Sequence, residues 1–391
     1  MRFKATALAL LMTVSMVSMA AAPAAATQQA DGEAYSGANI EFQTTGNAVA
    51  DYAVDGDVIV ENVTVQSASE ADSGVDAGLE STTDIDAAGL EIDSQARASA
   101  TISSESGAEM EAHDNQRGVM QVRADGESQV VNVNVSGEAE SESDERVVVT
   151  KDDGSQGTFI VVGDGEVVVN DEGEVNSELE QGSELVYRQY DGERSDDDEE
   201  TEKMIANGTA TAEVYVQQSA ESGQETAVEA IEYGEDTSVE VTSSAENEVN
   251  MTVERTQSEG KVVLTTVSEE AFENAGDIEV YVDGNAAAQA DSYSAVEQSA
   301  MEGDQPRYYV SQSSSAEATT DVAIGIDHFS ARNVQMTSED ESTATEDGST
   351  ATEGDSTDEQ SPADSQGDGA GFGALAALAA LASALVAVRH R

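Results

Sequence analysis

The sequence predicts a mainly β protein, built of antiparallel β-sandwich-like regions with a few short helices. Two observations indicate this class: apolar and polar residues alternate over many short segments, and Asp-Gly or other glycine turns separate those segments. A β-solenoid is an alternative, but the sequence shows no repeat of fixed length. A disordered acidic chain is a further alternative, because high net charge with few aromatic residues is also typical of disorder.

The composition limits the class of protein and its partners. The 391 residues include 80 Asp and Glu but only 16 Lys and Arg, which gives a net charge of −64, and there is no Cys. Such a charge drives a compact chain apart in dilute buffer, whereas about 1 M salt shortens the Debye length to about 3 Å. We therefore expect a protein of a hypersaline habitat that binds hydrated cations diffusely. Nucleic acid is not an expected partner of such a polyanion, and disulfides are excluded.

Residues 1–26 are typical of a secretory signal peptide. Two basic residues precede a short apolar run, and small residues follow. We expect the export machinery and a signal peptidase to act here, with cleavage after Ala26, so that the mature chain begins near Thr27. An earlier cut would leave Pro23 next to the scissile bond. An uncleaved anchor is the alternative, although it would need a longer apolar run.

Residues 27–190 are predicted to form a first β-rich region. Asp55-Gly56 is a two-residue hairpin signal between two alternating segments. In a later segment the valines at 131, 133 and 135 should face inward, with Asn132 and Asn134 outward. Residues 66–94 are expected to form a long surface loop or a weak edge region of a sheet, and an acidic loop is expected after residue 135. The expected strands are 48–54, 57–65, 95–103, 119–123, 128–135, 146–150, 158–162, 167–170 and 184–190.

Residues 191–208 are predicted to contain an acidic helix at the boundary between two β regions. Acidic residues crowd positions 196–200, Lys203 lies later, and Asn207-Gly208 supplies a stop, so we expect a short exposed helix at 195–206. The second β-rich region is 209–336. Its expected strands are 210–217, 226–233, 238–242, 246–256, 261–267, 277–283, 307–312 and 321–327, and its expected helices are 268–274 and 292–302.

Residues 337–369 are predicted to be a disordered Ser/Thr-rich stalk. The segment has no Val, Ile, Leu, aromatic or basic residue, so it cannot form a core. Tracts of this composition are often O-glycosylated, and a plain unmodified linker is the alternative. Fully extended, the segment would reach on the order of 100 Å, which is enough to lift a domain clear of a membrane.

The last segment, 370–391, is predicted to be a C-terminal transmembrane helix. Residues 370–388 are uncharged, and as a helix these roughly 19 residues would cover about 28 Å, close to the thickness of the hydrocarbon layer. The basic residues in Arg389-His390-Arg391 then place the C-terminus on the cytoplasmic side, with the remainder of the chain outside. A buried Ala-rich core helix is the alternative.

The residues Ala370, Gly371, Phe372 and Gly373, the apolar run with its basic end, and the acidic Ser/Thr tract before them resemble the PGF-CTERM sorting signal of haloarchaeal secreted surface proteins. In that family an archaeosortase removes the C-terminal helix, and the new end is joined to a membrane lipid. The resemblance therefore implies an anchored protein on the extracellular face of the cell membrane. Ala370 stands where the family has proline. This difference affects whether the archaeosortase would cleave the tail, and it does not affect the expected attachment to the membrane.

Four Asn-x-Ser/Thr sequons are candidate glycosylation sites, at Asn62, Asn134, Asn207 and Asn250. Asn134 and Asn250 lie on the polar face of their predicted strands, and Asn207 lies at a helix end. Asn62 shares a face with two valines of its predicted strand, which makes it the weakest of the four candidates.

No pattern predicts a catalytic, cofactor or metal site. The acidic clusters do not match a calcium-binding loop, so specific calcium sites remain an alternative to diffuse cations. The ordered part contains only His113 and His328, too few for an expected zinc site. Acids paired for glycoside hydrolysis do not stand out among so many, and aromatic platforms for sugars are scarce. His328 and Phe329, at the end of the last expected strand, are interpreted as packing residues.

The sequence thus predicts a non-catalytic cell-surface protein of a halophilic archaeon with a structural or interaction role in the cell envelope. The first alternative is a cation- or ligand-binding surface module, which stoichiometric calcium binding in molar NaCl would favour. The second is an extracellular hydrolase, which would lose its activity on substitution of a single Asp or Glu.

Overall fold

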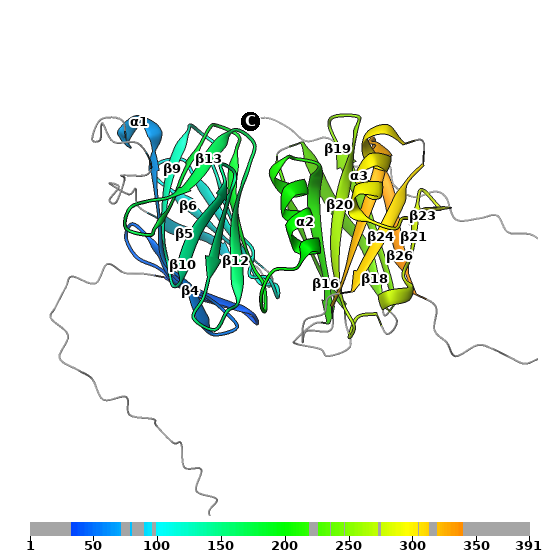
Figure 1. Ribbon diagram of the computed structural model, residues 1–391, viewed down its shortest axis with the longest axis horizontal. Coiled ribbons are helices and arrows are strands. Elements are labelled where there is room, and N and C mark those ends of the chain that lie inside the picture. Colours follow the sequence, from blue (N-terminus) through cyan, green and yellow to red (C-terminus); the bar gives the residue numbers. More distant parts are fainter. Residues whose placement is uncertain are drawn as a thin grey trace, which may run out of the picture. The chain divides into compact units, whose positions relative to one another are not determined.

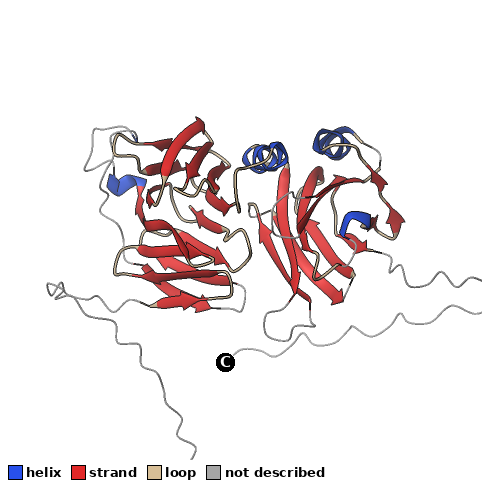
Figure 2. Ribbon diagram, turned by 60° about the horizontal axis from the view of Figure 1, so that its bottom comes forward, coloured by secondary structure: helices blue, strands red, loops and turns tan. Residues whose placement is uncertain are grey.

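The computed structural model describes residues 33–71, 79, 90–95, 99–218, 226–234, 236–245, 247–272, 275–303, 305–312 and 319–338. These residues form antiparallel sheets with few helices, which confirms the mainly β prediction (Figure 1, Figure 2). They belong to one compact unit, Met1–Ser342. The predicted signal peptide, the stalk beyond residue 338 and the C-terminal helix lie outside the described residues. Within the described part no helix is long and apolar enough to cross a membrane.

Sheets A and B form the first sheet pair, and every strand in them is antiparallel to its neighbours. A short helix, α1 (Ala68–Ala71), follows β4. In order across the sheet, sheet A contains β1 (Ala34–Ser36), β2 (Ile40–Thr44), β3 (Val49–Val54), β4 (Asp57–Ser67), β9 (Gln129–Val135), β14 (Val175–Leu179) and β13 (Gly165–Val169). Sheet B contains β10 (Glu138–Ser143), β11 (Arg146–Thr150), β12 (Gln156–Val162), β15 (Glu184–Gln189), β8 (Met120–Arg123), β7 (Glu109–His113), β6 (Ser99–Ser104) and β5 (Leu90–Gln95).

One apolar core joins sheets A and B. Alternate residues of the strands enter it, so Val131 and Val133 of β9 are fully buried, as predicted, while Asn132 and Asn134 lie on the opposite face. The predicted turn between β3 and β4 is also present: Asp55 and Gly56 both have positive φ, 52° and 84°, as the twist of a two-residue hairpin requires.

Sheets C and D form the second sheet pair, around a second apolar core. Most neighbours are again antiparallel, but β16 runs parallel to β20 and β23 runs parallel to β24. In order, sheet C contains β17 (Thr226–Glu232), β16 (Ala210–Gln218), β20 (Glu259–Ser268), β25 (Thr319–His328), β24 (Arg307–Gln312) and β23 (Ala288–Gln289). Sheet D contains β18 (Thr237–Ala245), β19 (Glu248–Arg255), β26 (Arg332–Thr337), β21 (Glu279–Val282) and β22 (Asn285–Ala286).

A third core lies on the other face of sheet C and is shared by α2 (Asp196–Ala206), α3 (Tyr293–Glu302) and apolar residues of sheet B. Helix α2 begins where the sequence predicts, because Ser195 and Asp198 form a reciprocal capping box. The prediction that this helix is exposed is wrong, since Met204 and Ile205 enter the third core. Gly325 of β25 allows α3 to approach: a Cβ there would lie 2.5 Å from the Val296 carbonyl oxygen.

Several expected boundaries are wrong for identifiable reasons. Strand β20 extends to Ser268 and a turn follows, so a helix does not begin at 268. The chain forms another strand, β26, after residue 330, and Thr337, assigned to the stalk, is its last residue. The acidic loop after residue 135 is strand β10, whose residues are exposed or half-buried at the edge of sheet B. A strand with no buried face carries no apolar alternation to detect, and its charges protect the edge from pairing.

Candidate functional site

Basic side chains in the described part of the chain are almost all engaged in ion pairs. Lys261 instead donates to the Gly208 carbonyl oxygen, and the Arg307 side chain has no hydrogen bond or ion pair with the described residues. The only large apolar side chains exposed in the described part are Val58 and Met301. The surface formed by the described residues is therefore strongly anionic and offers no apolar docking patch. The paired residues are Arg117, Arg123, Arg146, Lys151, Arg188, Arg194, Lys203, Arg255 and Arg332.

Many of these pairs form a buried polar layer where sheet B meets sheet C and α2. Its first centre is His113, at the end of β7, which is 2 % exposed. The Nδ1 atom of His113 lies 2.9 Å from Glu229 Oε1, and its Nε2 atom lies 3.1 Å from Gln121 Oε1. The Gln121 amide nitrogen is directed to a Glu184 carboxylate oxygen and to the Glu232 carbonyl, so its Oε1 must accept. Both ring nitrogens of His113 are therefore donors.

The environment of His113 favours the imidazolium form. Burial alone would lower the pKa of His113, but the hydrogen bond and charge of Glu229 outweigh it, with Glu111 adding to the effect, and the pKa is raised. A ring that donates at both nitrogens has no lone pair with which to accept a proton. His113 thus serves as a buried cation that joins the two sheet pairs, and not as a general base.

The second centre of the polar layer is Glu213 of β16, which is 1 % exposed. It accepts hydrogen bonds from Arg188 Nη2 at 2.9 Å, from the Tyr215 hydroxyl at 2.9 Å and from the Tyr233 hydroxyl at 2.7 Å. Arg188 belongs to β15, so this ion pair also joins sheets B and C. Burial would lower the pKa of Arg188, yet the charge of Glu213 and nearby oxygens raises it, and the guanidinium is charged.

Glu202 of α2 is the third centre and is fully buried. Its carboxylate accepts hydrogen bonds from Arg146 at 3.0 Å, Arg194 at 2.5 Å, the Thr158 hydroxyl at 2.7 Å and the Tyr190 hydroxyl at 2.8 Å. Two cations and two hydroxyls offset the cost of burying one carboxylate. Glu202 therefore fastens α2 to strands β11 and β12, and it has no free oxygen for chemistry.

Stability is expected to fall as the pH rises through the pKa of His113. The folded pKa lies above the unfolded value of about 6.5, so the imidazolium stabilises the fold fully below that value and is lost above the folded pKa. Burial also raises the pKa of Glu184, so this carboxyl likewise makes the fold less stable as the pH rises.

We expect His113→Gln to reduce the free energy of unfolding by about 1.5–3 kcal/mol at about pH 6 and to flatten the pH profile of urea unfolding in molar KCl. The exposed His328→Gln variant is the control, and equal profiles for the two variants would contradict the assignment.

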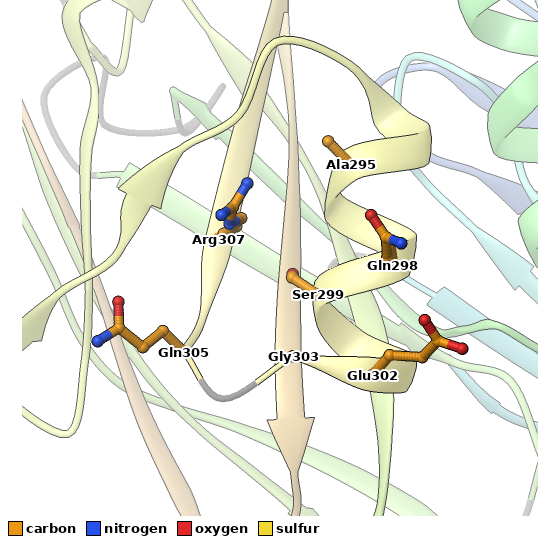
Figure 3. A pocket seen from close by; sticks show the side chains of 7 residues that line it. All are labelled: Ala295, Gln298, Ser299, Glu302, Gly303, Gln305 and Arg307. Carbon is orange, nitrogen blue, oxygen red and sulfur yellow. The ribbon is translucent and has the colours of Figure 1, made fainter.

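An open cavity of about 430 Å³ lies alongside α3 (Figure 3). Ala295, Gln298 and Ser299 line it from the helix, while Gln305 and Arg307 line it from the chain that leads into β24. Its charged side chains are exposed, and its lining contains no buried polar atom that lacks a hydrogen bond. These features are typical of a wet surface groove and do not select a ligand.

The four sequons lie on four different strands or turns. Asn207 is the exposed C-cap residue of α2, and Asn250 is half-buried on the outer face of β19, both as expected. Asn134 is half-buried and lies directly opposite Asn62 on the outer face of sheet A. The prediction that Asn62 shares a face with Val58 and Val60 is wrong for Val60, which is fully buried, because a bulge between residues 60 and 62 reverses the alternation of β4. Val58 is itself exposed.

Members of the acidic clusters accept hydrogen bonds from neighbouring polar groups of the protein. Asp153 accepts from the backbone and hydroxyl of Ser155, and Glu174 accepts from Asn132 and Asn170. In the described ranges no group of three or more His, Asp or Glu side chains is arranged to hold a metal ion. Phe329 is buried, as expected, against Arg255. His328 is not a packing residue: 63 % of its side chain is exposed, and it pairs with Asp327.

The comparison with known proteins assigns the chain to no family. No protein-family model matches the chain, and no curated protein sequence matches it. Among solved structures it is similar to heparan sulfate lyase HepC from Pedobacter heparinus, with 10 % identity over 56 % of this chain and 38 % of that chain, at a TM-score of 0.23. A mutant of the same lyase gives 11 % identity over 55 % and 38 %, at a TM-score of 0.19. The chain thus aligns with little more than a third of the lyase, and such TM-scores do not indicate a common fold.

Proposed function

We propose that this chain is an exported, non-catalytic surface protein of a halophilic archaeon, anchored at its C-terminus, with a structural or interaction role in the cell envelope. The observation that carries the proposal is the tail: an uncharged run of membrane length, a basic end, and an acidic Ser/Thr tract before it. The signal-like first 26 residues support export of everything between the two ends.

The distribution of charge supports the hypersaline part of the proposal. The few cations of the described residues are used in internal pairs, so almost nothing on the surface neutralises the acids. An exposed layer of carboxylates remains hydrated in molar salt and repels other copies of the chain. In this proposal the two sheet pairs are β-sandwiches of an ectodomain, carried on a stalk up to residue 369.

The central carboxylates of the polar layer support a non-catalytic role. Glu202 and Glu213 are held by cations and hydroxyls, and the His113 ring donates at both nitrogens. None of the three is free to transfer a proton. These groups act as links between the sheet pairs, which suits a protein that must stay folded outside the cell.

The proposal is tested by locating the full chain in a halophilic archaeal host. We expect the protein in the membrane fraction and accessible to a membrane-impermeant label on intact cells. A variant that lacks residues 370–391 should be released into the medium, because it keeps the leader and loses the anchor. A variant that lacks residues 339–369 instead, which leaves strand β26 intact, should stay on the membrane. Full-length protein found in the cytosol of intact cells would contradict the proposal.

A ligand-binding surface module is the second candidate function, and one observation favours it. A small cavity of about 200 Å³ between the sheet pairs is lined by charged and polar residues, among them Arg123, Asp125 and Glu232.

A further inference from the structure

The sequon at Asn207 differs from the other three sequons in its backbone. Asn207 is the exposed C-cap residue of α2, and a turn leads from it into β16. The Asn207 Oδ1 atom accepts from the Thr209 backbone N–H at 2.8 Å, which closes an Asx turn across the sequon. The Asn207 Nδ2 atom, to which an N-linked glycan is attached, makes no hydrogen bond with the described residues, so a glycan there displaces no contact.

Glycine at the middle position of the sequon makes this turn possible. Gly208 has a φ of 68°, in the left-handed region that favours glycine, and a Cβ added there would meet nothing within 4 Å. The middle residues of the other sequons are Val63, Val135 and Met251. Side chains of this kind disfavour a positive φ, so the sequon at Asn207 is the one whose sequence favours the turn. Its hydrogen bond spans only three residues, and it therefore forms without the sheets.

The acceptor nitrogens of the other three sequons lie in strands. Asn62 and Asn134 are half-buried and directly opposite each other in the ladder between β4 and β9, so a glycan on either residue crowds the other. Asn250 Nδ2 donates to Ser243 Oγ at 3.0 Å and to Glu248 Oε1 at 2.7 Å, and a glycan would displace at least one of these contacts. Glycosylated sequons are typical of surface loops, which these extended segments do not resemble.

The contacts of Thr209 indicate when a glycan is added. The sequon requires the Thr209 hydroxyl, which donates to Glu297 Oε1 of α3 at 3.3 Å, and Thr209 is only 9 % exposed. A transferase therefore reaches this hydroxyl before α3 packs beside it. Asn207 remains exposed after α3 has packed, so the folded protein accommodates the glycan.

We propose that Asn207 carries an N-linked oligosaccharide, selected over the other three sequons by its Asx turn and added before α3 packs. This inference rests on the proposed export, because N-linked glycans belong to exported chains. The donor is a lipid-linked oligosaccharide. Asn207 Nδ2 forms a bond to the anomeric carbon of the first sugar and loses a proton to solvent. The bond from that carbon to a phosphate oxygen of the lipid breaks, and the lipid phosphate leaves with its electron pair.

The test is the mass of intact glycopeptides from the full chain, isolated from a halophilic archaeal host whose own exported proteins carry N-linked glycans. A glutamate-specific protease separates the four sequons, because glutamates lie between all of them. We expect the glycosylated fraction of Asn207 to be at least about fivefold that of Asn62, Asn134 or Asn250. Equal fractions at the four sites, or an unmodified Asn207 on protein recovered from the cell surface, would overturn the inference and leave export intact. An unmodified Asn207 on protein retained in the cytosol would overturn both.

Two variants separate the turn from the reacting groups of the sequon. Gly208→Val keeps Asn207 and Thr209 but places a branched side chain at a positive φ, so the glycosylated fraction of Asn207 should fall at least about fivefold. Thr209→Val keeps the volume of the side chain and removes the hydroxyl, so the glycan should be lost. Asn134→Gln, which removes another sequon, is the matched control and should leave the fraction at Asn207 unchanged. Because the glycan is added before α3 packs, these fractions remain measurable in a variant that folds poorly. Wild-type glycosylation in Gly208→Val would show that the turn does not select the site.

Discussion

Transfer from about 1 M to about 0.01 M KCl is expected to unfold the protein, with loss of the far-UV circular dichroism of its sheets, because the Debye length grows from about 3 Å to about 30 Å. The chain has a net charge of −64, and the cations of its described part are held in internal pairs. At low salt the exposed carboxylates therefore repel one another without screening, and the unfolded chain relieves that repulsion by expanding.

Two controls separate charge screening from other effects of salt. Replacing two exposed acids of β10 in a Glu138→Lys/Glu140→Lys variant should lower the salt concentration at the unfolding midpoint. Sucrose, which does not screen charge, should not replace KCl. An unfolding temperature that is the same at both salt concentrations would contradict this prediction. Absence of a β spectrum in molar salt would instead favour the disordered acidic chain.

The substitution Arg188→Met is expected to reduce the free energy of unfolding by about 3–5 kcal/mol, because it leaves a buried carboxylate without its cation. Arg188 is 2 % exposed, and its Nη2 atom donates to Glu213 Oε1 at 2.9 Å. Methionine fills much of the same volume, so most of the loss reflects the charge left on Glu213. Urea unfolding in molar KCl measures the difference.

The matched control is Lys203→Met on the exposed side of α2. Lys203 pairs with Glu200 at 2.8 Å, but both side chains are 45 % exposed, so its loss should cost no more than about 0.5 kcal/mol. Adding Glu213→Gln to Arg188→Met should restore part of the stability, since the amide is neutral and still accepts from the tyrosine hydroxyls. A loss of stability in Arg188→Met no larger than in Lys203→Met would show that the pair is not a structural link.

Local patterns predicted much of the fold, because alternation and turn chemistry act over a few residues. The Asp55-Gly56 hairpin, the inward valines of β9 and the limits of α2 follow from such signals. Features that depend on contacts between distant parts of the chain could not be predicted from these local patterns. The parallel pairing of β16 with β20 depends on a crossover through sheet D, and the bulge that turns Asn62 outward depends on its partner strand.

The polar layer could not be predicted, because its acids are hidden among the 80 Asp and Glu residues of the chain. Nothing in the sequence distinguishes Glu202 or Glu213 from an exposed carboxylate. The signal that could have located the polar layer is in the basic residues: Arg188 directly follows the apolar residues 185–187 of its strand, and basic residues are scarce in this chain. A lone arginine inside a buried strand requires an acidic partner, which marks the position of a buried ion pair without naming the partner.

The most direct test of export and C-terminal anchoring is the intact mass of the protein isolated from halophilic archaeal cells. We expect a chain that begins near Thr27, is recovered from the membrane and ends near Gly369, with added mass from any lipid or glycan. Retention of Arg391 on membrane-bound protein would exclude cleavage of the tail and leave anchoring intact. A mass equal to that of the unprocessed 391 residues, recovered from the cytosol, would contradict the account.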